Sequence, residues 1–73
     1  MPSYEPLKSA RRVLDVLVAL NRAPTTSIRD LHAATGIPKP TLVRILETLV
    51  AAGFVARDAN RGGYQVTSAV TNL

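Results

Sequence analysis

The feature that most constrains the fold of this chain is a stretch bounded by two glycines, Gly36 and Gly53. Pro38 and Pro40 lie near its beginning, where proline restricts the backbone and is tolerated in the first turn of a helix. A glycine directly after an apolar periodic pattern is typical of a helix end. These signals predict a tight turn followed by one well-delimited helix over about residues 39–52.

The predicted helix has two unlike faces. Its apolar stripe, at helical spacing, comprises Leu42, Ile45, Leu46, Leu49 and Ala52. Its opposite face comprises Pro40, Thr41, Arg44, Glu47 and Thr48. Because this second face carries short, hydroxylated side chains around a single Arg, it suits insertion into a groove. We therefore expect this helix to lie against DNA.

Length and composition limit the classes of function. Seventy-three residues make one small domain, which buries only about 60% of its unfolded surface. The net charge of +4 favours an acidic partner. The absence of Cys excludes disulfides and thiolate sites, and one His with five carboxylates leaves little for metal ligation or acid–base chemistry. We expect no enzyme, metal or cofactor.

No segment of the sequence indicates a membrane or an exported protein. The longest apolar run, residues 16–20, is far shorter than the roughly 18 residues of a membrane span. The chain also does not begin with a signal-peptide pattern. The expected compartment is the cytoplasm, with no membrane partner.

The amino-terminal part predicts an arm and a first helix. Residues 1–6, with two prolines and no periodicity, are expected to be a flexible arm, and a helix follows over about residues 7–22. Its predicted core stripe is Ala10, Val13, Leu14, Leu17 and Leu20, and Arg11 and Asp15 are expected to form a surface pair. Val16 and Val18 widen the apolar face. Either they are ordinary core valines, or this helix also packs against a second copy or another domain.

A second helix is predicted from Ser27 to Thr35. Ser27 followed by Asp30 resembles a capping box, and Ile28, Leu31 and Thr35 are expected to point inward. The hydroxylated start at Thr26 and Ser27 has two interpretations, a phosphate clamp or an ordinary helix beginning. His32 is expected to be a partly buried packing residue rather than a ligand or a base.

After Gly53 the apolar period changes from 3.6 to 2. Residues 54–57 and 64–67 have strand composition, and the turn-rich residues 58–63 between them predict a hairpin. Arg61 lies at its tip, so the hairpin is either a mobile wing that follows a DNA backbone or a solvated loop. Ser68 is expected to cap a last helix that begins at Ala69.

Together these elements predict a mainly α fold with a small β-hairpin. Three helices, a short turn between the second and third, and a two-stranded wing make a winged helix-turn-helix over residues 7–67. The third helix is then the recognition helix.

The sequence resembles a known family in several segments. Residues 30–49, continued by residues 52–55 and 64–66, are similar to the amino-terminal DNA-binding domain of IclR-type transcriptional regulators. Within that family they are most similar to the branch that controls the catabolism of aromatic acids. The resemblance covers about residues 7–73. It is specific in the Thr-Gly-Ile-Pro-Lys segment at 35–39, followed by Thr41 and Arg44.

The resemblance implies a bacterial repressor or activator that binds a palindromic operator as a homodimer or homotetramer. It also implies a larger carboxyl-terminal domain that binds a small-molecule effector, so residues 68–73 would begin a linker helix to a domain absent from this chain. The sequence departs from the family at Pro40, where Ser is usual, at Arg11, where an apolar residue is common, and at His32, where Ala is usual. Pro40 removes a backbone donor and a hydroxyl at the start of the recognition helix.

The expected partner is double-stranded DNA, and the expected contacts divide by role. At base edges, Arg44 pairs with guanine, and the methyl groups of Thr41, Val43 and Thr48 meet thymine. Phosphates are expected at Lys39, Thr26, Ser27 and Arg61, while Pro40 lies at the start of the recognition helix. The alternative is a winged-helix module for protein–protein association. An enzymatic function has almost no support.

Overall fold

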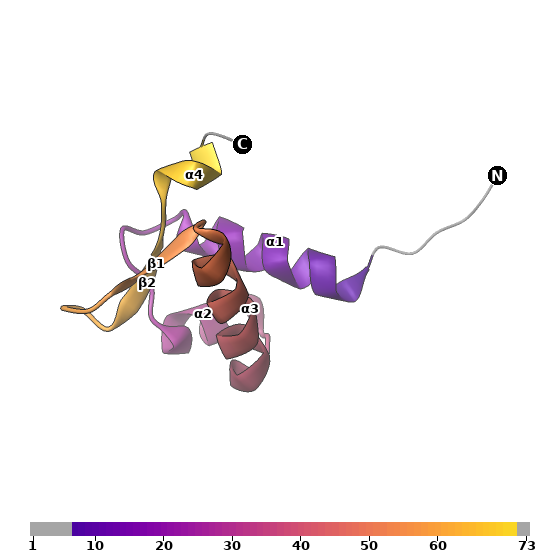
Figure 1. Ribbon diagram of the computed structural model, residues 1–73. Coiled ribbons are helices and arrows are strands. Elements are labelled where there is room, and N and C mark those ends of the chain that lie inside the picture. The colour runs from indigo at the N-terminus through magenta and orange to yellow at the C-terminus, as the bar shows by residue number, and fades with distance from the viewer. Residues whose placement is uncertain (1–6, 72–73) are drawn as a thin grey trace.

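The computed structural model describes residues 7–71 as helices with a hairpin extending to one side (Figure 1). In chain order the elements are α1 (Lys8–Leu20), α2 (Ile28–Thr35), α3 (Lys39–Ala52), β1 (Val55–Asp58), β2 (Gly63–Val66) and α4 (Ser68–Thr71). The two strands form one antiparallel sheet. This arrangement confirms the predicted winged helix-turn-helix. The predicted arm, residues 1–6, lies outside the described residues.

The recognition helix α3 has the predicted bounds. Gly36 before it adopts a left-handed backbone with φ 72°, a conformation that glycine takes without steric cost, and Gly53 ends it. Buried leucines on one face confirm the predicted stripe: Leu42, Leu46 and Leu49. Ala52 was predicted to be in the core and is exposed. It is the last helical residue, where the chain turns away towards β1.

Helix α1 packs on only part of the predicted face: Leu20 is buried, and Val13 and Leu17 pack against the core, as predicted. Val16, Ala19 and Leu20 are buried, whereas Leu14 is 59% exposed and Ala10 is exposed. The predictions that Leu14 and Ala10 lie in the core are therefore wrong. Half the circumference of this helix is apolar, so its sequence allowed more than one packing face, and the contacts with α2 and β2 select one of them.

The two valines that widen the apolar face have opposite outcomes. Val16 is fully buried and is an ordinary core residue, while Val18 is 55% exposed. Leu7 is also exposed, and it shares one side of the helix with Leu14 and Val18 because they are seven and four residues apart. The unpartnered apolar surface of α1 is therefore the row of Leu7, Leu14 and Val18.

The hairpin is anchored to the segment that precedes α2. Thr26 forms a bridge with Tyr64, with N–H to carbonyl distances of 2.9 Å and 2.8 Å in the two directions. Gly63 lies so close to this segment that an added Cβ would lie 3.0 Å from the carbonyl oxygen of Thr26 and would clash with the Thr25 methyl group. β1 begins one residue later than predicted, and β2 begins one residue earlier. The bridge from Thr26 to Tyr64 and the pairing of Val55 with Val66 set this register.

The last helix, α4, is capped by a different residue from the predicted one. The Thr67 hydroxyl oxygen accepts a hydrogen bond from the Ala69 N–H at 3.3 Å, whereas Ser68 is already helical, so the prediction of Ser68 as the cap is wrong. The same hydroxyl donates to the carbonyl of Gly53 at 2.6 Å. Thr67 thus connects the end of α3 with the start of α4.

Candidate nucleic-acid interface

The outward face of α3 presents the side chains that the sequence places there. Lys39, Pro40, Arg44 and Thr48 are exposed, and Thr41 is half-buried. A shallow hollow of about 280 Å³ lies between this face and α1, lined by Val13, Thr41, Arg44, Ile45 and Thr48. Three of the predicted base-contacting residues therefore share one concave surface. Val43 is half-buried and does not line the hollow.

One of these side chains already has a hydrogen bond within the helix. The Thr48 hydroxyl donates to the carbonyl of Arg44, one turn earlier, at 2.8 Å. This bond fixes the Thr48 rotamer, since β-branched side chains have few allowed rotamers in a helix. The threonine at this position therefore offers its methyl group for contact more readily than its hydroxyl.

The predicted phosphate clamp before α2 is only partly available. Ser27 caps α2, because its hydroxyl oxygen accepts the N–H of Asp30 at 3.1 Å, as the capping pattern predicts. Thr26, in contrast, is 8% exposed, and its N–H donates to Tyr64. The backbone N–H of Thr26 is therefore not available to a phosphate in this structure, because the bridge to the hairpin uses it. Ser27 remains half-buried at the surface.

The turn between α2 and α3 is held by two side chains. The Thr35 hydroxyl donates to the carbonyl of Leu31 at 2.6 Å and accepts the N–H of Ile37 at 3.2 Å. The Nδ1 atom of His32 lies 2.7 Å from the carbonyl of Ile37. Since a carbonyl only accepts, this nitrogen carries the hydrogen. Both backbone groups of Ile37 are bonded, which holds the start of α3 against α2.

His32 differs from its predicted environment. It was expected to be a partly buried packing residue, and it is exposed. Its hydrogen bond to the turn explains why a polar residue occupies this position on the edge of α2. The sequence placed His32 at the edge of the apolar face of α2, whereas in the structure it lies on the exposed side.

The tip of the hairpin is organised by one carboxylate. The Asp58 carboxylate accepts the N–H groups of Asn60 and Arg61, both at 3.1 Å, and the hydroxyl of Thr25 at 3.2 Å. These bonds form a compact turn and connect it to the segment before α2. The Arg61 side chain is exposed at this tip. The wing therefore presents its cation from a hydrogen-bonded turn.

These bonds predict a pH-dependent contribution of Asp58 to stability. The N–H of Arg61 lowers the pKa of Asp58 below its ordinary value of 3.8, with further lowering by the N–H of Asn60 and the Thr25 hydroxyl. A carboxylate with a lowered pKa stabilises the fold above its unfolded-state pKa, and this stabilisation is lost as pH falls through the lowered value. The Tm difference between wild type and Asp58→Ala is thus expected to be constant above about pH 5 and to shrink below pH 4.

The matched control is Glu47→Ala, which removes an exposed carboxylate that makes no hydrogen bond with the described residues. Thermal unfolding followed by circular dichroism between pH 2 and pH 7 measures both variants. A Tm difference for Asp58→Ala that stays constant down to the lowest pH would contradict the proposed role of this carboxylate.

Among the described residues no three His, Asp or Glu side chains gather as metal ligands. Within residues 7–71 no helix combines the length and the hydropathy needed to cross a membrane.

Two contributions to this surface were missed by sequence reasoning. Val13 lines the hollow beside Arg44, and Thr25 supports the wing through Asp58. Val13 lies one turn before Val16 and Leu17, so its spacing predicted that it packs in the core. The spacing did not predict that it lies beside Arg44. No local pattern relates Thr25 to Asp58, because 33 residues separate them.

Comparison with known proteins agrees with this geometry. A family model described as the IclR helix-turn-helix domain matches residues 9–59. The crystal structure of HmgR from Pseudomonas aeruginosa is 31% identical, with a TM-score of 0.81 over 90% of this chain and 28% of that chain. An IclR family transcriptional regulator from Brucella abortus is 30% identical, with a TM-score of 0.83 over 93% of this chain and 26% of that chain. A comparison with curated proteins gave no match.

These matches identify the family of the chain and the domain that the chain contains. The chain spans less than a third of the length of the solved structures that it matches. The matched family and structures are those of transcriptional regulators and not of enzymes. Because the family match covers well over half of the chain and the fold agrees with it, the chain belongs to the IclR family of transcriptional regulators and comprises its helix-turn-helix DNA-binding domain.

Proposed function

We propose that this domain binds a specific double-stranded operator, with α3 in the major groove and the hairpin tip, residues 58–63, on the sugar–phosphate backbone. The observation that carries the proposal is the outward face of α3, where Thr41, Arg44 and Thr48 line one hollow on an exposed helix surface. A helix of this kind fits the width of the major groove, and its side chains then meet base edges.

The proposed contacts divide into base and phosphate contacts. Arg44 pairs with guanine, and the methyl groups of Thr41, Val43 and Thr48 meet thymine methyl groups. The phosphate contacts comprise Lys39, Ser27 and Arg61. Pro40 lies at the start of α3, where it has no N–H and contributes only apolar contact. Thr26 is left out because its N–H is bonded to Tyr64.

The whole protein is proposed to act as a bacterial repressor or activator in the cytoplasm. The sequence resemblance of residues 30–49 supports the branch of the family that controls aromatic-acid catabolism. We propose that α4 begins a linker helix to a carboxyl-terminal domain, through which a small-molecule effector acts. The bond from Thr67 to Gly53 supports this proposal, because it holds the residue before α4 next to the end of α3.

The test is a titration of labelled duplex DNA at several salt concentrations. Lys39 and Arg61 each neutralise about one phosphate and release its counterion, so affinity is expected to fall as the salt concentration rises. Arg61→Ala is expected to weaken cognate and random DNA alike and to reduce the salt slope by about one unit. Absence of binding at low salt would contradict DNA binding, and an unchanged slope for Arg61→Ala would leave the wing out of the interface.

The exposed row of Leu7, Leu14 and Val18 favours a second function, protein–protein association through α1. We propose that its partner is a second copy of the domain on a palindromic operator, in a homodimer or homotetramer of the whole protein. Such a patch is smaller than the roughly 1,000 Å² of a stable interface, so the isolated domain is expected to pair only when DNA supplies the effective concentration.

Leu14→Ser combined with Val18→Ser is expected to abolish paired binding and to preserve the fold, because both side chains are more than half exposed. Val16→Ser is the contrasting variant, since it places a hydroxyl in the core and is expected to destabilise the domain. Sedimentation with and without a palindromic duplex measures pairing. A tight dimer without DNA, or paired binding that survives the double substitution, would contradict this prediction.

A further inference from the structure

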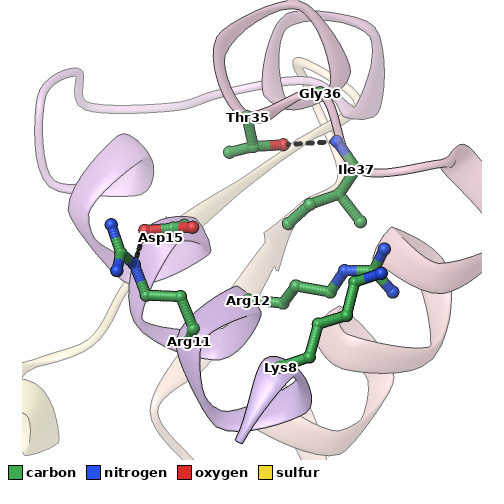
Figure 2. A pocket seen from close by; sticks show the side chains of 7 residues that line it. All are labelled: Lys8, Arg11, Arg12, Asp15, Thr35, Gly36 and Ile37. Atoms are coloured by element: carbon green, nitrogen blue, oxygen red, sulfur yellow. Dashed lines mark hydrogen bonds and ion pairs between the residues drawn. The ribbon is translucent and has the colours of Figure 1, made fainter. Parts of the chain in front are cut away.

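A cavity of about 520 Å³ lies between the first half of α1 and the turn that joins α2 to α3 (Figure 2). The turn contributes Gly36 and Ile37 to its wall, and α1 contributes Lys8, Arg11, Arg12 and Asp15. Three of the α1 side chains are cations, and one is an anion. The cavity is therefore a site with an excess of positive charge, separate from the hollow that contains Arg44.

The charges in this cavity are unevenly paired. The Nε atom of Arg11 lies 3.2 Å from a carboxylate oxygen of Asp15, which is the ion pair that its spacing predicts. Figure 2 shows Arg11 turned towards Asp15, while Lys8 and Arg12 extend in the other direction. Within residues 7–70 no carboxylate pairs with Lys8 or Arg12.

Two adjacent cations repel each other, and an anion between them removes that repulsion. Lys8 and Arg12 are one helical turn apart, so the helix itself holds them on the same side. Arg12 is half-buried, which restricts its guanidinium to a smaller set of positions than a fully exposed side chain has. The planar guanidinium group of Arg and the ammonium group of Lys both bind phosphate oxygens well.

The position of the cavity indicates the source of the phosphate. Arg12 is followed by Val13, which lines the hollow with Thr41 and Arg44. Ile37, on the opposite wall, lies two residues before the start of α3. α1 thus contributes to both cavities, one beside the turn that precedes α3 and the other beside α3 itself. With α3 in the major groove, the turn before its amino-terminal end lies near the DNA backbone that borders the groove.

We propose that Lys8 and Arg12 bind a phosphate group of the DNA backbone that flanks the segment contacted by α3. The proposal rests on the proposed DNA binding and extends the contact surface from the helix-turn-helix to α1. Such a contact fixes the position of the domain on the duplex and does not distinguish base sequences.

The experiment compares the salt dependence of duplex binding for wild type, Lys8→Ala, Arg12→Gln and the double variant. Two lost phosphate contacts reduce the salt slope by about 1.8 units, so between about 50 and 200 mM salt the double variant loses roughly tenfold less affinity than wild type. Arg22→Ala is the matched control, because it removes one exposed cation that lines a different hollow. Arg12→Lys is expected to retain the slope, and thermal unfolding verifies that each variant is folded.

A second measurement locates the contact on the DNA. Duplexes with a neutral methylphosphonate at single backbone positions are expected to weaken wild-type binding at one flanking position and to leave the double variant unaffected there. A double variant with the wild-type salt slope, or with a reduction in slope no larger than that of Arg22→Ala, would overturn the inference while DNA binding stands. No binding of wild type to any duplex would overturn DNA binding itself.

Inorganic phosphate distinguishes a free anion from the DNA backbone. The amide signals of Gly36 and Ile37 are followed by NMR as phosphate is added to the protein without DNA. Saturable shifts in wild type that the double variant lacks, together with a wild-type salt slope in the double variant, would assign the cavity to a free anion and overturn the DNA assignment.

Discussion

Leu46→Ala is expected to lower the free energy of unfolding by about 2–5 kcal/mol, the usual cost of truncating a fully buried leucine. Leu46 has no exposed surface and lies in the cluster that joins α1, α2 and α3. A domain of this length has a total stability of roughly 4–11 kcal/mol, at about 0.05–0.15 kcal/mol per residue. One substitution therefore removes a large part of the stability, and DNA binding falls with the folded fraction.

The matched control is Leu14→Ala, which truncates the same side chain at a position that is 59% exposed. Urea denaturation followed by circular dichroism gives the midpoint and the slope for both variants. Leu14→Ala is expected to remain within about 0.5 kcal/mol of wild type. Equal losses at the two positions would mean that Leu14 is buried, as the sequence predicted, and would contradict the observed packing of α1.

Arg44→Ala is expected to weaken binding to the cognate operator by about 1–3 kcal/mol and to weaken binding to random DNA less. Arg44 is exposed at the centre of the outward face of α3, and Thr41 and Thr48 line the same hollow. An Arg that pairs with a guanine edge contributes discrimination between sequences, whereas a phosphate contact contributes equally to all of them. The cognate duplex is first obtained by selection from random sequences.

Arg22→Ala provides the charge control, because it removes one exposed cation that lines a different hollow, between α1 and α2. Fluorescence anisotropy at one salt concentration gives the affinities of both variants for the cognate and a scrambled duplex. Equal losses on the two duplexes for Arg44→Ala would make this residue a backbone contact. A loss for Arg22→Ala as large as that for Arg44→Ala would indicate a general charge effect.

The local signals in the sequence located the recognition helix and the hairpin. Proline and glycine act through the backbone of their own segment, so they predicted the bounds of α3 without knowledge of its neighbours. The change of period after Gly53 predicted the wing for the same reason. The outward position of Arg44 followed from the helical period, because the opposite stripe of α3 is apolar and must be buried.

The tertiary contacts decided what periodicity left open. The sequence of α1 has an apolar surface that is wider than its packing face, so only contact with α2 and β2 buried Val16 and exposed Leu14. The backbone N–H of Thr26 is not available to a phosphate because it donates a hydrogen bond to Tyr64 in β2, which is far away in the sequence.

What the sequence determined by itself is the set of elements and the family, since both depend on short segments and their residue patterns. What only the tertiary structure decided is which side chains from separate segments meet: Thr25 with Asp58, Val13 with Arg44, and the pair of Lys8 and Arg12 with the turn at Gly36. The physical reason is that helix and turn propensities act over a few residues, whereas these contacts depend on how whole elements pack, and packing is selected by the combined burial of all of them.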